Sequence, residues 1–170
     1  AAWAGKAGGH QIVTTAVEHH AVLHPLQQLA KFGFEVIELP VDRYGRLDPD
    51  VLSAALTDRT ILVAIGHANN EVGTIQQLAE LIARVRSDGP RGCLVAVDAV
   101  ASAPYLAIDV ETLGCDFLAI AAHKFEGPKG AGALYLRAGT HILSLQQGGA
   151  QERFRRAGTE DVAGAVGMGV

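Results

Sequence analysis

The sequence predicts an α/β fold in which a mainly parallel β-sheet lies between two layers of helices. Three largely apolar runs of strand length stand at residues 60–65 (TILVAI), 93–97 (CLVAV) and 115–121 (CDFLAIA). Strands that are apolar on both faces are typical of a parallel sheet covered on both sides. Stretches of helical period separate these runs, which indicates strand–helix–strand units.

The remaining elements follow from local patterns. Strands are expected where β-branched or apolar residues run or alternate, and these positions are residues 11–15, 34–39, 60–65, 93–97, 115–121 and 132–136. Helices are expected where apolar residues recur on one helical face, and these positions are residues 21–31, 48–56 and 75–85. Gly33 suits the end of the first helix, and Asp48 and Pro49 suit the N-cap and first position of the second. Ile75, Leu78, Ile82 and Val85 form the apolar stripe of the third. Residues 42–46 indicate a turn.

The composition is that of one globular domain. The chain has 170 residues, of which 49% are hydrophobic and 19% charged, and this excludes a disordered chain. The net charge of −4 gives no reason to expect binding to nucleic acid or to an anionic membrane. No apolar run has the length of a membrane span and no secretory leader opens the sequence, so we expect a cytoplasmic protein.

The two cysteines, Cys93 and Cys115, adjoin apolar runs, and we expect them to be buried, reduced thiols. The sequence has no Cys-x-x-Cys and no spacing typical of a zinc site, so we expect no metal. Neither end has a cap or a polar tail. We therefore expect a piece of a longer chain, truncated at both ends.

Polar side chains follow four of the predicted strands at the point where each strand ends. They are His19, Asn69 with Asn70, Asp98, and His123 with Lys124. In open α/β sheets the ligand lies outside the carboxyl ends of the strands. We therefore expect these side chains to gather at one edge of the sheet.

Lys124 occupies an unusual position for a charged residue, between a buried strand and a loop that contains Gly127, Gly130 and Gly132. Desolvation there would favour a reactive amine, so Lys124 is a candidate for covalent attachment to an aldehyde. The alternative is a lysine at a strand end that reaches solvent, followed by ordinary turn glycines.

The other polar residues match what pyridoxal phosphate needs beside a lysine. An acid must face the pyridine nitrogen, and Asp98 ends a buried strand where a lone carboxylate would need a cation. His19 suits stacking or proton transfer, Asn70 could bond a ring oxygen, and His123 could reach the phosphate. Three of these groups also have a structural alternative, because Asp98 could cap a turn, His19 could be structural, and the two asparagines could form only a turn.

Together these motifs resemble the cysteine desulfurases, class V members of the pyridoxal-phosphate aminotransferase superfamily. The matching stretches occur in family order across almost the whole chain. They are residues 15–23 (TAVEHHAVL), 67–73 (HANNEVG), 97–99 (VDA), 123–135 (HKFEGPKGAGALY), 148–153 (GGAQER) and 156–160 (RAGTE). The resemblance implies the large cofactor-binding domain over residues 1–170, without the small C-terminal domain.

The resemblance also implies roles for single residues. Lys124 would carry the cofactor and Asp98 would pair with its ring nitrogen. His19 would stack on the ring and assist proton transfer, Asn70 would bond the ring oxygen or the substrate, and His123 would contact the phosphate. Thr159 would reach the phosphate of the neighbouring subunit's cofactor, which implies a homodimer.

In the family, L-cysteine becomes L-alanine and its sulfur passes to an enzyme cysteine as a persulfide. A sulfur acceptor or scaffold protein, for example in iron–sulfur cluster assembly, is then an expected partner. Cys93 and Cys115 lie too early in the chain to be that cysteine. Since the family's persulfide loop is missing, we expect the chain to be inactive by itself.

Two positions that would contact the cofactor depart from the family pattern. Ala101 stands where the family has a glutamine that bonds the ring hydroxyl, and Ala121 stands where it has a serine or threonine that bonds the phosphate. Losing two neutral hydrogen bonds of roughly 0.5–1.5 kcal/mol each weakens cofactor binding without abolishing it. Glu126 also replaces a residue that is often small or aromatic. Two alternatives stay open: another class V enzyme, such as a selenocysteine lyase, a carbon–sulfur lyase or an epimerase, and a non-catalytic dimer or scaffold-binding domain degenerate at both alanines.

Overall fold

The computed structural model describes residues 1–6 and 8–170, and it has the predicted α/β architecture. One sheet contains six strands in the order β2-β1-β3-β4-β5-β6. The strands are β1 (Gln11–Thr15), β2 (Glu35–Leu39), β3 (Thr60–Gly66), β4 (Leu94–Asp98), β5 (Phe117–Ala121) and β6 (Gly132–Leu136). The first five run parallel, and β6 pairs antiparallel with β5.

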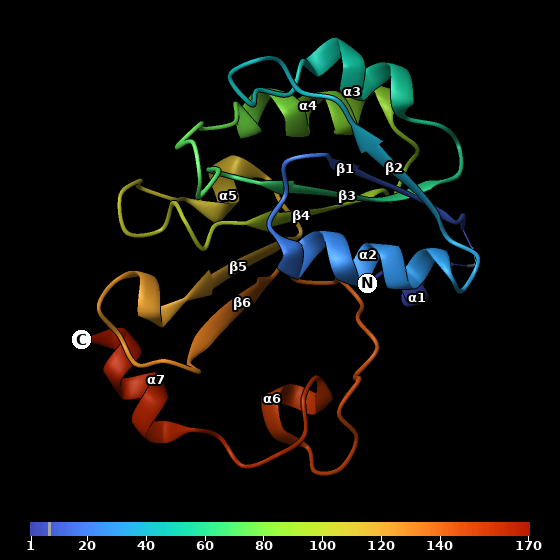
Figure 1. The fold of residues 1–170 in the computed structure, drawn as a ribbon. Coiled ribbons are helices and arrows are strands. Elements are labelled where there is room, and N and C mark those ends of the chain that lie inside the picture. The colour runs from blue at the N-terminus through green and yellow to red at the C-terminus, as the bar shows by residue number, and fades with distance from the viewer. Residues whose placement is uncertain (7) are drawn as a thin grey trace.

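Helices cover both faces of this sheet (Figure 1). The helical elements are α1 (Ala2–Gly5), α2 (His20–Ala30), α3 (Pro49–Ala55), α4 (Leu78–Asp88), α5 (Val110–Leu113), the 3₁₀ turn η1 (Ala122–Lys124), α6 (Gln151–Phe154) and α7 (Val162–Gly169). The helices α3 and α4 lie over one face, and α1 and α2 lie over the other. The three-layer prediction is therefore confirmed.

Each face of the sheet has its own apolar core. Under α3 and α4, Leu52, Leu81 and Val85 pack with the inward side chains Val63 and Val95. On the other face the core is smaller, and its buried members are Ala2, Ile12, Leu26, Phe34, Ile61, Leu62 and Ala64. Because each central strand supplies side chains to both cores, its sequence is apolar without alternation.

One predicted helical residue lies outside its helix. Ile75 was expected on the stripe of α4, but α4 begins at Leu78, and Ile75 forms an isolated antiparallel bridge with Ala68. The preceding turn is held by Gln76, whose buried side chain accepts from Leu47 N–H at 3.0 Å and donates to the Gly45 carbonyl at 2.7 Å. These bonds keep the backbone extended up to the start of the helix.

The chain after β6 leaves the sheet and ends in α7, which packs against the loop that follows η1 (Figure 1). A Cβ added at Gly167 would lie 3.2 Å from ring carbons of Pro128, and one added at Gly164 would lie 3.3 Å from the Ala131 Cβ. Small residues on α7 thus allow its backbone to approach this loop closely.

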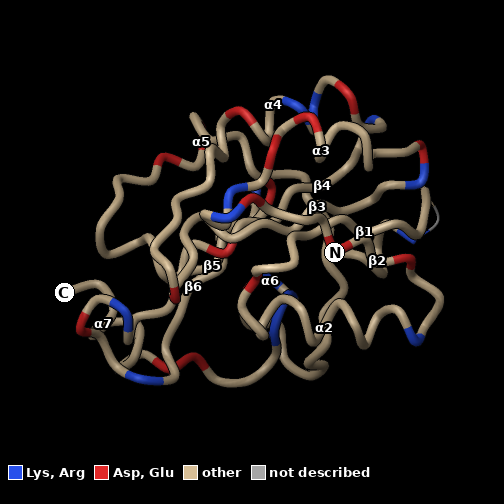
Figure 2. Tube along the Cα trace, turned by 45° about the horizontal axis from the view of Figure 1, so that its top comes forward, with Lys and Arg blue, Asp and Glu red and all other residues tan. Residues whose placement is uncertain are grey.

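Charges of both signs are interspersed along the chain, as Figure 2 shows. The best-buried ionic contact is at Asp116, which Arg86 contacts at 2.7 Å and Arg137 at 3.6 Å. Val95 N–H also donates to Asp116, at 2.7 Å. Within the described part of the chain, no helix is both long enough and apolar enough to cross a membrane.

The core under α4 is expected to carry much of the stability. Leu81 is fully buried, so Leu81→Ala should lower the free energy of unfolding by about 2–5 kcal/mol, through lost transfer energy and the cavity left behind. Leu145→Ala is the matched control, because that side chain is 93% exposed and should change stability by less than about 0.5 kcal/mol. Urea unfolding of both variants measures the difference, and equal effects would contradict the core assignment.

Candidate active site

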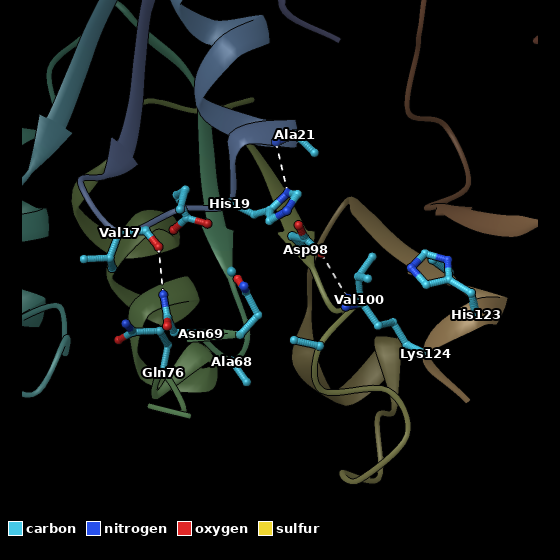
Figure 3. Close-up of a pocket in the computed structure, with 15 residues that line it drawn as sticks. Val17, His19, Ala21, Ala68, Asn69, Gln76, Asp98, Val100, His123 and Lys124 are labelled. Carbon is cyan, nitrogen blue, oxygen red and sulfur yellow. Dashed lines mark hydrogen bonds between the residues drawn. The ribbon is translucent and has the colours of Figure 1, made fainter. Parts of the chain in front are cut away.

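A cavity of about 300 Å³ lies at the carboxyl ends of the parallel strands. Five of the six predicted site residues border it, namely His19, Asn70, Asp98, His123 and Lys124. Asp98 is the last residue of β4, and the other four come from the segments that follow β1, β3 and β5 (Figure 3). The parallel sheet thus brings together residues that are up to 105 positions apart in the sequence, from His19 to Lys124.

Asp98 is half-buried at the last position of β4. Its Oδ1 accepts a hydrogen bond from Val100 N–H at 2.9 Å, and its backbone carbonyl accepts from His67 N–H at 2.8 Å. The predicted turn-capping alternative is therefore correct for one carboxylate oxygen. It is compatible with the ligand role, since Asp98 also borders the cavity.

His19 is the N-cap of α2, and its side chain performs the capping. The Nδ1 atom accepts a hydrogen bond from Ala21 N–H at 3.1 Å. An accepting Nδ1 carries no proton, so the neutral imidazole has its proton on Nε2. The cap therefore fixes both the ring orientation and the nitrogen that can donate a proton.

Lys124 ends η1 and is exposed, so the expected desolvation is not present. The 3₁₀ turn carries the chain out of the sheet at this point: Ala122 N–H bonds the Ala131 carbonyl, and Gly127 N–H bonds the Ala122 carbonyl at 2.9 Å. A Cβ at Gly127 would lie 2.8 Å from the Ala122 Cβ, so this close return requires glycine. The loop positions Lys124 at the cavity without burying it.

The two adjacent asparagines differ. Asn69 is structural, because its Nδ2 donates to the Val17 carbonyl at 2.9 Å and its Oδ1 accepts from Glu71 N–H and Val72 N–H. Asn70 is exposed at the border of the cavity, where it stays a predicted ligand.

Thr159 is exposed and is not among the residues that border this cavity. This position is compatible with its predicted role toward a neighbouring subunit, which stays a prediction. Ala101 and Ala121 both border the cavity, so the two departures noted in the sequence lie at the site itself.

Two polar residues of the cavity wall were not predicted, Glu18 and Gln76, and both are buried. Thr15 Oγ1–H donates to Glu18 Oε1 at 2.7 Å. Desolvation raises the pKa of Glu18 from its usual range, and the nearby charge of Asp98 adds to this. In the sequence, Glu18 stands out only as an acidic residue immediately before His19.

The comparisons with known proteins agree with this architecture. The model of the family described as "Aminotransferase class-V" matches residues 2–170. The chain is 51% identical to the cysteine desulfurase IscS of Dictyoglomus turgidum and 49% identical to that of Methanosarcina thermophila, over 99% of its own length. It spans only 42% and 41% of those two relatives.

Solved structures give the same result. A NifS-like protein aligns with a TM-score of 0.95 at 40% identity, covering 98% of this chain and 46% of that one. A structure described as SspA in complex with cysteine aligns with a TM-score of 0.92 at 32% identity, covering 99% and 48%.

The capping role of His19 can be separated from any chemical role. His19→Ala should lower the free energy of unfolding by about 1 kcal/mol, because Ala21 N–H loses its acceptor. His19→Asn should restore most of this loss, since asparagine is a good N-cap but has no imidazole. Thermal and urea unfolding of the pair provide the measurement, and equal destabilisation of both variants would show that the cap contributes nothing.

Proposed function

The chain belongs to the aminotransferase class-V family, and from this premise we propose that it forms the large, cofactor-binding domain of a pyridoxal-phosphate-dependent cysteine desulfurase. The observation that carries the proposal is the meeting of Lys124, Asp98 and His19 at one cavity. Relatives named cysteine desulfurase, identical at about half of the aligned positions, support the choice within the family.

The residues around the cavity fit the cofactor by their chemistry. Pyridoxal phosphate supplies an electron sink that stabilises negative charge at the α-carbon of an amino acid. The Lys124 amine would hold its aldehyde carbon, and the Asp98 carboxylate would hold the proton of its ring nitrogen. The His19 ring would lie against its face, and His123 would contact its phosphate.

The same residues would handle the substrate protons. His19 presents Nε2–H, because Nδ1 is occupied by the Ala21 cap. Lys124 is exposed beside the cavity and can accept a proton in its amine form. Both groups border the cavity that would hold a small amino acid such as L-cysteine.

We further propose a homodimer, with Thr159 directed to the partner's site, and delivery of sulfur to an acceptor protein that serves iron–sulfur clusters or a thio-cofactor. The exposed position of Thr159 supports its availability to another subunit. A second function, that of a non-catalytic dimer or scaffold-binding domain, is favoured by the alanines at positions 101 and 121, which supply no hydrogen bond to a cofactor.

A cofactor titration distinguishes these two functions. Mixing the protein with pyridoxal phosphate should produce a visible absorbance band that Lys124→Ala abolishes, because the amine is lost. Lys129→Ala is the matched control, since this exposed lysine lies in the same loop but does not border the cavity, and it should keep the band. The absence of any band in the wild type at excess cofactor would favour the scaffold function.

Turnover by this chain alone is expected to be minimal. Both of its cysteines are buried, and burial raises the pKa of Cys93 to about 11 and raises the pKa of Cys115 as well. At pH 8 only about one Cys93 thiol in a thousand is then ionised, so neither thiol is suited to accept sulfur. Alanine and sulfide release from L-cysteine measures this, with a full-length desulfurase as positive control, and sustained turnover would refute the expectation.

A further inference from the structure

One position in the cavity wall has no side chain of its own, because residue 66 is a glycine. Gly66, the last residue of β3, pairs with Asp98 of β4. Residues paired across neighbouring strands project to the same face of a sheet, about 5 Å apart. A Cβ built on Gly66 would lie 2.9 Å from Glu18 Oε2, so the Glu18 carboxyl occupies the place of the missing side chain.

Glu18 is held there by groups from two strands. Thr15, fully buried at the end of β1, donates its hydroxyl to Oε1 at 2.7 Å, and Oε2 lies against Gly66 at the end of β3. Only 9% of the Glu18 surface is exposed. The Glu18 carboxyl therefore lies where the side chain of residue 66 would face Asp98 across the two strands.

We propose that Glu18 is a positioning residue of this site: its carboxyl forms an acid pair with Asp98 in which Glu18 holds a proton and Asp98 keeps the negative charge that faces the cavity. Burial disfavours the ionised form of Glu18, and the charge of the neighbouring Asp98 disfavours it further, so one proton is retained at the pair. The more buried member, Glu18, is the one that retains it.

The groups around the two acids support this assignment of the proton to Glu18 and the charge to Asp98. Asp98 is the less buried acid, and Val100 N–H donates to it at 2.9 Å. The donor to Glu18 is the neutral hydroxyl of Thr15. The other ionisable groups around the cavity are His19, His123 and Lys124, and all three are exposed.

The acid pair gives the wall an adjustable charge. With its proton on Glu18, the wall presents one negative charge, which is enough to balance one cationic ring nitrogen at Asp98. When Glu18 ionises at higher pH, the wall presents two. The identity of the cation rests on the proposed function, whereas the pair itself rests on the burial of Glu18 and on the placement of Gly66, Glu18 and Asp98.

The test follows the glutamate carboxyl carbons by ¹³C NMR across a pH titration of the cofactor-free protein, with Glu18 assigned by the loss of its signal in Glu18→Gln. In the wild type, Glu18 should titrate above the ordinary midpoint of glutamic acid. In Asp98→Asn, which keeps the oxygen that Val100 uses, the Glu18 midpoint should fall by about half a pH unit or more, because a neighbouring charge is removed.

An unchanged Glu18 midpoint in Asp98→Asn would overturn the pair. A Glu18 signal that titrates at the ordinary midpoint in the wild type would place the proton elsewhere and also overturn it. These outcomes are independent of cofactor binding: a missing absorbance band refutes the proposed function but leaves the pair standing, and the reverse also holds.

Stability against pH gives a second readout that serves even if Asp98→Asn does not fold. A raised Glu18 pKa means that the folded protein binds this proton more tightly than the unfolded chain does. As the pH rises above about 4.3, the ordinary pKa of glutamic acid, the melting temperature of the wild type should therefore fall relative to that of Glu18→Gln. Parallel melting curves for the two proteins would contradict the proposal.

Discussion

Parallel pairing of β1, β3, β4 and β5 is the constraint on which the site depends. Parallel strands end at the same edge of a sheet, so each residue that follows a strand arrives beside the others. The register aligns Gly66 with Asp98, and the Glu18 carboxyl fills the side-chain position that Gly66 leaves open. The buried cores on the two faces maintain that register, because a shift by one residue would turn every apolar side chain to the wrong face.

Several residues of the site serve the fold and the chemistry at the same time. His19 caps α2 through Nδ1 and thereby presents Nε2–H to the cavity. Asp98 holds the next turn through one oxygen. Gly127 allows the loop after η1 to return closely to Ala122. The structural and functional explanations of such residues are therefore compatible rather than competing.

Much of this arrangement was predictable from sequence, because a polar residue after an apolar run is visible without a structure. His19, Asn70, Asp98, His123 and Lys124 were all found in this way. Of the two interpretations of Lys124, the strand-end lysine that reaches solvent matches its exposure and the desolvated amine does not, since nothing in the apolar run 115–121 reveals that a 3₁₀ turn then leaves the sheet.

Other features depend on contacts between distant segments. The role of Glu18 requires β1 to lie beside β3, and that of Gln76 requires the turn at Gly45 to lie beside the start of α4. The antiparallel direction of β6 was also not predicted, because the pattern of residues 132–136 is the same for either direction. The hydrogen bonds of the Gln76 side chain keep Ile75 out of α4, and the periodicity of the apolar residues gives no sign of these bonds.

The contact between α7 and the loop after Lys124 links two parts of the chain that are some distance apart in sequence. Gly164 and Gly167 fit against Ala131 and Pro128, so the last helix acts as a brace for the segment that positions the lysine. The conformation of that loop therefore depends partly on residues that follow it by more than 30 positions in the sequence. A displacement of α7 would therefore have to be accommodated at Pro128 and Ala131, in the loop that follows the lysine.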